Sequence, residues 1–410
     1  MGSTGRKAAM PFIMLTVLID MMSIGIIAPV LPKLVGGFMG SAADTSFAFG
    51  AVQVVYALAQ FFSAPVLGAL SDRYGRRPIL LLGLFGMAVN FFVTALATAF
   101  WALLVVRMVG GMLCANVAVA NAYVADITDP KNRARNYGML GAMFGLGFIL
   151  GPVTGGLLGD HNIHWPFFAA GALALLNGLY GYFILPESLP QERRRTFELK
   201  RVHPFAAVAR LREFKGVESL VWVIGLSTLA QFILHTCWML YTEFKFGWSP
   251  RDNGMSLFAV GLMAVLVQGG LMRQFQKYIP APKLASIGLI SSTVAFIGYG
   301  AVPAGWMMYV VVCANLFGYA VNPTIQAIIS NAVDPHRQGE SMGAISSINS
   351  VAAVLAPLLG APVLATVSHY PRGDWHIGMP FFFCAVLQGI AAWVGIRYFA
   401  RQRISATAAA

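Results

Sequence analysis

The chain alternates between long apolar runs and short polar segments over almost its whole length of 410 residues. Twelve of the runs reach the roughly 20 residues that a helix needs to cross the hydrocarbon core of a bilayer. The pattern therefore predicts an all-α membrane protein with twelve transmembrane helices. The predicted helices lie at about 12–34, 47–70, 79–98, 101–125, 136–159, 166–186, 219–243, 253–274, 283–302, 306–330, 341–366 and 379–399.

Small residues and prolines recur between the first six and the last six runs at one constant offset. The repeated positions are Asp129-Pro130, Gly138, Pro152 and Gly155, which return as Asp334-Pro335, Gly343, Pro357 and Gly360. The repeat predicts two pseudo-symmetric bundles of six helices, at 1–186 and, with a short tail, at 219–410. The segment 187–218, which contains Pro190 and charges of both signs, is predicted to be a linker between them.

The composition supports a membrane protein, because 58% of the residues are hydrophobic and only 11% are charged, against about 25% charged in soluble domains. The formal net charge of +12 could indicate a nucleic-acid partner, but the positions of the basic residues do not. Nearly all Lys and Arg fall on one side of the predicted helices, and the other side holds only Lys33, Lys245, Arg251 and Arg372. The positive-inside rule then places both termini and the linker in the cytoplasm. Basic charge thus sets the topology, and we expect no nucleic-acid binding.

A charged turn, Gly68-Ala-Leu-Ser-Asp-Arg-Tyr-Gly-Arg-Arg-Pro-Ile-Leu80, separates the second and third runs. Its charged side chains cannot lie in hydrocarbon, so the turn is expected at one membrane face. Gly68 and Gly75 are expected to allow close approach of the backbone. The pattern G-x-L-x-D-R-x-G-R-R-x-x-L resembles the loop signature of the major facilitator superfamily between its second and third helices. The resemblance implies the fold of that superfamily, in which a substrate site lies between two six-helix bundles near the bilayer midplane.

Asp126 ends the fourth predicted helix on the cytoplasmic side, and the resemblance places it close to Arg76 and Arg77. In this superfamily such an acid pairs with the charged turn and holds the halves closed on the inside. The resemblance therefore implies a conformational latch made of Gly68, Asp72, Arg73, Gly75, Arg76, Arg77 and Asp126.

Two ionisable residues, Asp20 and Arg107, lie well inside apolar runs, where charge is costly and usually functional. Desolvation favours the neutral form of a carboxylate, which makes protonation of Asp20 near neutral pH plausible. Asp20 is therefore predicted to be a proton-coupling or cation-attracting site. The alternative is a structural carboxylate held by backbone donors or a basic neighbour. Arg107 keeps its charge and needs a counter-ion, water or substrate. Its segment resembles a superfamily pattern, R-x-x-x-G, associated with proton transfer; the alternative is a role in holding helices together.

The fifth run contains Gly141-Ala-Met-Phe-Gly-Leu-Gly-Phe-Ile-Leu-Gly-Pro-Val-Thr-Gly-Gly156. A bare surface for close helix contact is expected at Gly145, Gly147, Gly151, Gly155 and Gly156. Pro152 removes a backbone donor and should bend the helix. The stretch resembles the antiporter motif of drug exporters, which favours exchange over symport or uniport. A generic small-residue helix interface is the alternative.

Uncharged polar residues also occur inside the runs, and interhelical hydrogen bonds are their usual role. A subset could line a cavity for a bulky amphipathic molecule, because residues seven or four apart share a helix face. The candidate cavity residues are Gln53, Gln60, Asn90, Asn116, Gln231, His235 and Gln326.

Several stretches together resemble the tetracycline-efflux branch of the drug:proton antiporters, notably Leu18–Pro32, Leu67–Pro78 and Tyr241–Trp248. Those pumps carry further acids at positions that align with Asn90 in the third helix and with Ser291 or Ser292 in the ninth. Both positions are neutral here. The difference argues against tetracycline as substrate, and especially against a cationic metal–tetracycline complex, and leaves more of any proton coupling to Asp20.

The predicted function is export of a small amphipathic, drug-like compound in exchange for protons by a monomeric protein of the bacterial inner membrane. One alternative is a facilitator or a translocator of lipid-like amphiphiles without obligate proton exchange. Another is a sensor or scaffold that transports nothing. The sequence shows no nucleophile–base pair, no metal-ligand spacing and no nucleotide-binding glycine loop. We therefore expect no enzymatic activity, no metal and no cofactor.

Overall fold

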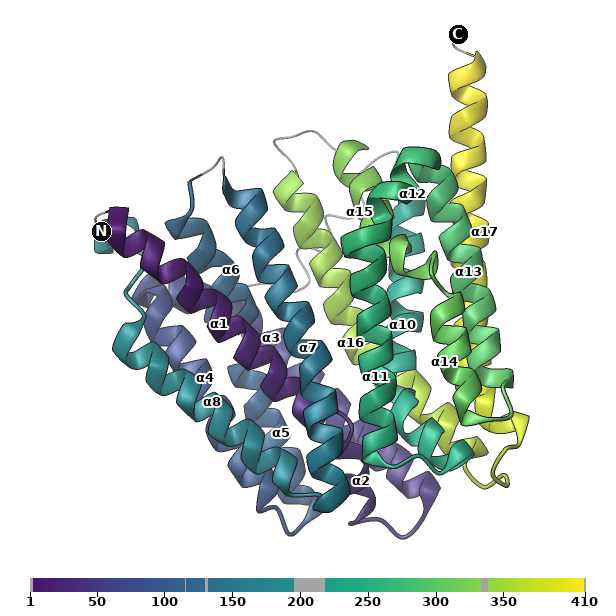
Figure 1. Ribbon diagram of the computed structural model, residues 1–410, viewed down its shortest axis with the longest axis horizontal. Coiled ribbons are helices and arrows are strands. Elements are labelled where there is room, and N and C mark those ends of the chain that lie inside the picture. The colour runs from purple at the N-terminus through teal and green to yellow at the C-terminus, as the bar shows by residue number, and fades with distance from the viewer. Residues whose placement is uncertain (1–2, 115, 130–131, 195–217, 333–337, 409–410) are drawn as a thin grey trace. The chain divides into compact units, whose positions relative to one another are not determined.

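The computed structural model describes residues 3–114, 116–129, 132–194, 218–332 and 338–408 (Figure 1). These residues form helices and connecting turns, without any strand. Most of the predicted linker, 195–217, lies outside the described residues, as do Pro130, Asp334 and Pro335 of the repeat.

The helices of the first half of the chain are α1 (Ser3–Ile27), α2 (Leu31–Gly36), α3 (Ala42–Tyr74), α4 (Arg76–Ala95), α5 (Phe100–Leu113), α6 (Asn116–Ile127), α7 (Arg133–His161), α8 (Trp165–Ile184) and the 3-10 helix η2 (Gln191–Arg193). Those of the second half are α10 (Glu218–Phe246), α11 (Pro250–Val265), the π-helix η5 (Leu266–Leu271), α12 (Met272–Tyr278), α13 (Ala281–Ala301), α14 (Gly305–Ala314), the 3-10 helix η6 (Gly318–Ala320), α15 (Val321–Ala332), α16 (Gln338–Val367), the 3-10 helix η8 (Trp375–Gly378) and α17 (Met379–Ala408).

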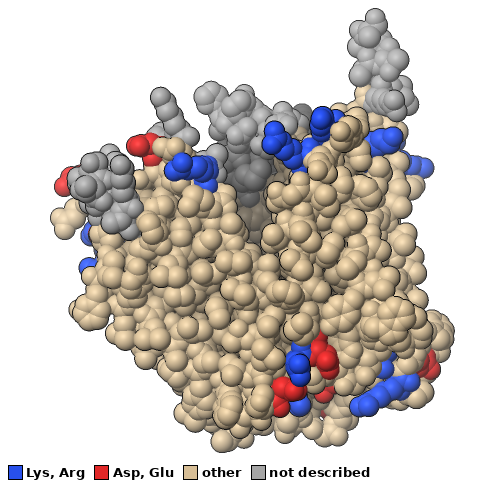
Figure 2. All heavy atoms as spheres, in the orientation of Figure 1, with Lys and Arg blue, Asp and Glu red and all other residues tan. Residues whose placement is uncertain are grey.

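Eleven helical segments of the described chain are long and apolar enough to cross a membrane. The bent pair Gly305–Ala314 and Gly318–Ile329 makes a twelfth. Each segment falls on one of the predicted runs, so the prediction of an all-α membrane protein with twelve spans is confirmed. Figure 2 shows the same pattern on one face, where Lys, Arg, Asp and Glu gather at the ends of helices and leave their middles uncharged.

Three spans are interrupted rather than continuous. The first breaks between Ile27 and Leu31, where Pro29 has no N–H to continue the helix. The fourth breaks between α5 and α6, and there the Cys114 N–H bonds the Gly111 carbonyl, three residues back, in a tight final turn. The tenth bends by 53° between α14 and the η6–α15 segment. The fourth and tenth spans hold the same place in the two sets of six, so the break is part of the repeat.

The described residues divide into two compact units. The first falls within Met1–Met39, Ala51–His203 and Ser249–Gly261, and the second within Gly40–Gly50, Pro204–Trp248 and Leu262–Ala410. Each unit thus takes the first turns of one helix, α11 or α3, from the opposite half of the sequence. The predicted bundles at 1–186 and 219–410 remain a prediction.

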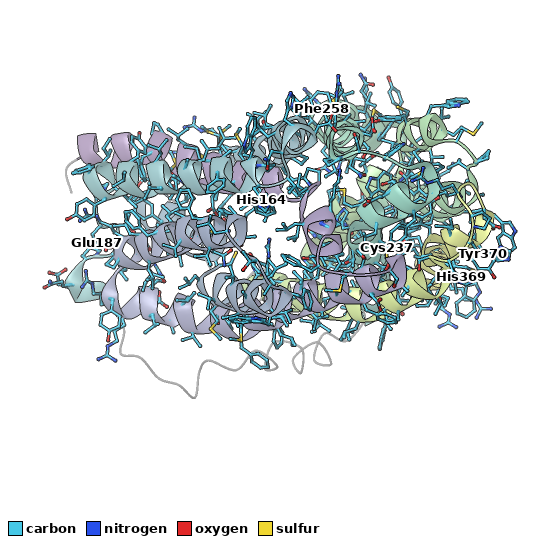
Figure 3. All side chains as sticks on the ribbon, turned by 90° about the horizontal axis from the view of Figure 1, so that it is seen from below. His164, Glu187, Cys237, Phe258, His369 and Tyr370 are labelled. Atoms are coloured by element: carbon cyan, nitrogen blue, oxygen red, sulfur yellow. The ribbon has the colours of Figure 1, made fainter. Side chains whose placement is uncertain are left out.

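The two units repeat one packing arrangement. In the first, α7 packs along α1, as Figure 1 shows, and Gly155 lies against the backbone of Ile26. In the second, α16 packs along α10, and a Cβ at Gly360 would lie 2.8 Å from the Cys237 sulfur, which Figure 3 labels. Small residues at matching positions therefore set matching helix contacts in both units.

Candidate functional site

The antiporter-like stretch of α7 holds the helix that carries Asp20. Gly147, Gly151 and Gly155 are spaced by four and share one face of α7. A Cβ on Gly147 or Gly151 would lie 2.6 Å from the carbonyl oxygen of Leu18 or Met22, respectively, and one on Gly155 would contact the Ile26 carbonyl. The two helix backbones therefore touch over two turns, and any side chain at these positions would push α1 away.

Asp20 lies on α1 between two of these contacts and is 3% exposed. Its carboxylate faces the break in the fourth span, where the Asn116 side-chain amide donates to Oδ1 at 3.1 Å. Asn116 is the first residue of α6, and its amide also lies 3.6 Å from the Met87 sulfur of α4. The helix interruption thus brings a hydrogen-bond donor to the buried carboxylate. Substrate and ion sites of transporters commonly form at such discontinuous helices.

Arg107 of α5 is 4% exposed, and its Nε and Nη2 atoms are buried without a hydrogen-bond partner among the described residues. Within that part of the chain Asp20 and Arg107 form no ion pair. The two ionisable residues that the sequence singles out are therefore not paired with each other, and only Asp20 has a hydrogen-bond partner among the described residues.

Tyr56 of α3 and Cys114 at the helix break lie in one cluster with Asp20 and Arg107. The side chains of Tyr56 and Cys114 interact electrostatically with each other and with Asp20. Tyr56 also interacts electrostatically with Arg107. A Cβ on Gly111 would contact the Tyr56 carbonyl, so a glycine is required for this close approach of α3 and α5.

Five of the predicted cavity residues have a polar contact with another described residue. Asn116 binds Asp20, and the Gln60 amide lies 3.8 Å from the Cys114 sulfur. The Asn90 amide donates to the Val106 carbonyl, which ties α4 to the residue before Arg107. Gln231 and His235 pair with each other at 3.2 Å on one face of α10. Gln53 and Gln326 are half-buried and hydrogen-bond to no other described residue.

Ser291 aligns with the second acid that tetracycline-efflux pumps carry and that is neutral in this chain. Its side chain, like that of Asn90, is hydrogen-bonded. Its hydroxyl donates to the Asn315 side chain at 3.0 Å, at the bend of the tenth span. Both positions therefore carry uncharged groups engaged with a neighbouring helix, and neither supplies a carboxylate.

The remaining residues of the antiporter-like stretch face a different helix. A Cβ on Gly156 would lie 2.6 Å from the Pro250 carbonyl, and Gly254 of α11 lies against the Pro152 carbonyl. The stretch therefore serves two interfaces of the first unit, one with α1 and one with the first turns of α11. Gly145 makes neither contact: no described atom lies within 4 Å of a Cβ placed there. The expectation of a close contact at Gly145 is wrong for the described chain.

The charged turn consists of a single non-helical residue, Gly75, between α3 and α4. Gly75 has φ of +106°, a conformation that side chains rarely adopt. Gly68 differs, because no described atom lies within 4 Å of its Cβ position. The expected close approach is therefore present at Gly75 and absent at Gly68, whose carbonyl accepts from the Ser71 hydroxyl at 2.7 Å.

Arg76 is the centre of the predicted latch residues and is 9% exposed. Its Nε lies 3.1 Å from Oδ2 of Asp126, and its Nη1 lies 2.7 Å from Oδ1 of Asp72 and 2.6 Å from the Ser71 hydroxyl. One guanidinium thus joins the end of α3 to the end of α6, as the resemblance implies.

Arg73 and Arg77 do not reach Asp126. Arg73 is exposed and lies over the Tyr74 ring at 5.1 Å. Arg77 donates to the Tyr182 carbonyl at 2.6 Å and lies over the ring of the same residue. Among the described residues Arg77 therefore contacts the last turn of α8 and forms no ion pair with Asp126.

Sequence reasoning missed Glu187, the residue that completes this region. Its carboxylate accepts the backbone N–H of Arg76 at 2.8 Å and that of Arg77 at 3.2 Å, and so caps α4. The following residue, Ser188, donates to Asp126 at 3.2 Å. Figure 3 shows Glu187 at one end of the ribbon, beyond the helices. A Cβ on residue 75 would overlap the Glu187 carboxylate, which explains why a glycine is needed there.

Comparison with known proteins matches the chain to one family. The family model of the Major Facilitator Superfamily matches residues 13–357. The chain is 34% identical over 380 residues to a tetracycline resistance protein of class C from Escherichia coli, covering 92% of this chain and 96% of the relative. It is 28% identical over 382 residues to multidrug resistance protein 2 of Bacillus subtilis (strain 168), covering 89% and 91%.

Among solved structures, the human organic anion transporter MFSD10 (TETRAN) superposes with a TM-score of 0.69 at 23% identity, covering 95% of this chain and 99% of that one. The likeness shows the same fold. The family and these relatives are transporters and not enzymes. With the fold, the charged turn and a family match over most of its length, the chain belongs to the major facilitator superfamily.

Proposed function

We propose that this protein exports a lipophilic or amphipathic, drug-like compound in exchange for protons, by alternating access in the bacterial inner membrane. Relatives named for tetracycline and multidrug resistance support efflux, and their bacterial sources support the location. We further propose that the protein is a monomer. The distribution of basic residues supports a topology with both termini in the cytoplasm. The ion pairs of Arg76 with Asp72 and Asp126 would hold the transporter closed on its cytoplasmic side.

The single observation that carries proton exchange is the buried carboxylate at a helix break. Asp20 is the one carboxylate of the described spans that lies more than about one helical turn from a span end. It has an uncharged partner, Asn116, which can hydrogen-bond either protonation state. A carboxylate that is paired with an amide rather than a cation can be neutralised without breaking an ion pair.

The antiporter-like stretch supports the same function through geometry. Its three glycines hold the backbone of α1 on both sides of Asp20. A displacement of α7 would therefore be transmitted to the carboxylate. In this mechanism a proton arriving from outside neutralises Asp20, and release of that proton inside accompanies the return step.

The experiment is transport by purified protein in liposomes, with tetracycline and the amphipathic dye rhodamine 123 as probes. An imposed pH gradient should drive accumulation of an accepted probe. Asp20→Asn should lower gradient-driven accumulation by more than about tenfold. Asp160→Asn, which changes an exposed carboxylate at the end of α7, is the matched control and should behave as the wild type.

A flux that ignores the pH gradient would contradict proton exchange and favour the facilitator. That alternative has one structural observation in its favour, since Asn90 and Ser291 supply no further carboxylate. Full concentrative export by Asp20→Asn would remove Asp20 from the mechanism while leaving export intact.

A further inference from the structure

We propose that Arg107 binds the anionic group of the transported compound, so that the substrates are amphipathic organic anions. The inference rests on the proposed function, since it names the substrate class of the same site. It is drawn from the burial of the Arg107 side chain in the first unit and from its lack of hydrogen-bond partners among the described residues.

The Arg107 guanidinium is buried but not satisfied within the described chain. Its Nε and Nη2 atoms have no hydrogen-bond partner there, and the residue is only 4% exposed. An arginine remains charged in a protein interior, so its charge cannot be removed by deprotonation. A buried charge without a partner is strongly unfavourable, so an anion bound at this guanidinium would stabilise it.

The neighbouring side chains do not supply that anion. The carboxylate of Asp20 binds Asn116 and forms no ion pair with Arg107 in the described structure. The Asn90 amide, on the helix beside Arg107, donates to the Val106 carbonyl and carries no charge. Tyr56 and Cys114 carry no charge in their ordinary protonated forms and so supply no anion. The other carboxylates of the described spans lie within about one turn of a span end.

The two unpartnered atoms define the kind of group that fits. Nε and Nη2 form one edge of the planar guanidinium, and their N–H bonds run parallel. Two parallel donors match the two oxygens of a carboxylate, sulfonate or phosphate in a bidentate pair. A neutral carbonyl would use only part of this edge, and a cationic group would be repelled by it.

The test uses one aromatic scaffold with three charges: 2-naphthylacetate, its neutral amide 2-naphthylacetamide, and the cation 2-(2-naphthyl)ethylammonium. Binding is read from the shift in melting temperature of the purified full-length protein, and flux is read in liposomes. The wild type should prefer the anion over the amide by about tenfold or more, because a hydrogen bond to a charged group is much stronger than a neutral one.

Two variants test whether the preference comes from Arg107. Arg107→Gln should remove the preference for the anion and leave binding of the amide, whereas Arg107→Lys should recover part of it. Arg273→Gln, which changes an exposed arginine of α12, is the matched control and should keep the preference. If Arg107→Gln does not fold, Asn90→Asp places a carboxylate beside α5 and should lower the preference in an otherwise wild-type protein.

The outcomes separate this inference from the proposed function. Equal or better binding of the amide or the cation, or binding of none of the three, overturns the anion inference and leaves export by another substrate class standing. An anion preference that survives in Arg107→Gln and Asn90→Asp also overturns it. Arg107-dependent anion binding without any flux supports the anion site and contradicts the proposed export.

Discussion

The carboxylate of Glu187 accepts the backbone N–H of Arg76 at 2.8 Å, although 111 residues separate the two in the chain. It also accepts the N–H of Arg77 and that of Leu189. The first turn of a helix presents unsatisfied donors and the positive end of the helix dipole, so a carboxylate is a favourable partner there. The contact joins the end of α8 to the start of α4 and supports the helix turn from which the Arg76 side chain projects.

We expect Glu187→Gln to lower the free energy of unfolding by about 1–3 kcal/mol, because two of these hydrogen bonds at the helix start lose their charged acceptor. The measurement is the melting temperature of the purified protein in detergent. Glu192→Gln is the control, since Glu192 lies exposed in η2 a few residues further on. Equal melting temperatures for both variants would show that the cap contributes nothing.

Arg76→Lys should be destabilising although it keeps the charge. The guanidinium reaches Asp126 through Nε, and Asp72 and Ser71 through Nη1, which a single ammonium group cannot reproduce. A double-mutant cycle with Asp126→Asn should give a coupling energy of about 0.5–3 kcal/mol. Arg73→Lys, at an exposed position in the same turn, should change little. Additive effects of Arg76→Lys and Asp126→Asn would contradict the pairing.

The same latch residues show how far sequence reasoning reaches. The twelve spans follow from apolar runs alone, because a lipid-embedded helix must be apolar over its whole length. The pairing of Arg76 with Asp126 followed only from the resemblance to a family. Glu187 carried no signal, because its partners are backbone N–H groups of a distant helix. The one available indication was Gly75, whose Cβ position the carboxylate occupies.

The helix breaks and the glycine contacts were only partly predictable. Pro29 could have indicated the break in the first span, since proline cannot continue the hydrogen-bond ladder. The break beside Cys114 has no proline, and it places the donor of Asn116 on Asp20. The glycine spacing was informative: Gly147, Gly151 and Gly155 share a face, whereas Gly156 is turned by about 100° toward another helix.

The pH dependence of stability should include a contribution from Asp374, which lies just outside the last span. The backbone N–H of His376, and then its side chain, hydrogen-bond the carboxylate and lower the pKa of Asp374. A carboxylate whose pKa is lower in the folded than in the unfolded protein stabilises the fold at any pH above the unfolded-state pKa. This stabilisation is lost as the pH falls through the folded-state pKa.

Asp374→Asn should therefore melt below the wild type near pH 6, and the two melting temperatures should converge below about pH 4. The measurement is melting temperature against pH in detergent. Because the Asp374 side chain is partly exposed and its charge is screened by solvent, the difference should be small. A difference that stays constant down to acid pH would mean that the carboxylate charge is not responsible.

The contact between α7 and α1 gives the sharpest test of how Asp20 is positioned. A Cβ on Gly151 would lie 2.6 Å from the Met22 carbonyl and 2.7 Å from the Gly25 Cα, distances that real Cβ atoms do not show. Both neighbours are backbone atoms, so Gly151→Ala can be accommodated only by moving one helix. We expect a loss of about 1–3 kcal/mol in stability and a fall in pH-driven transport.

Gly145→Ala is the matched control, because it adds the same methyl group to the same helix where no described atom lies within 4 Å. It should keep the wild-type melting temperature and transport rate. Purified protein of both variants is compared by melting temperature and by transport in liposomes. If Gly151→Ala melted and transported like Gly145→Ala, close contact at this glycine would not be what holds the helix of Asp20 in place.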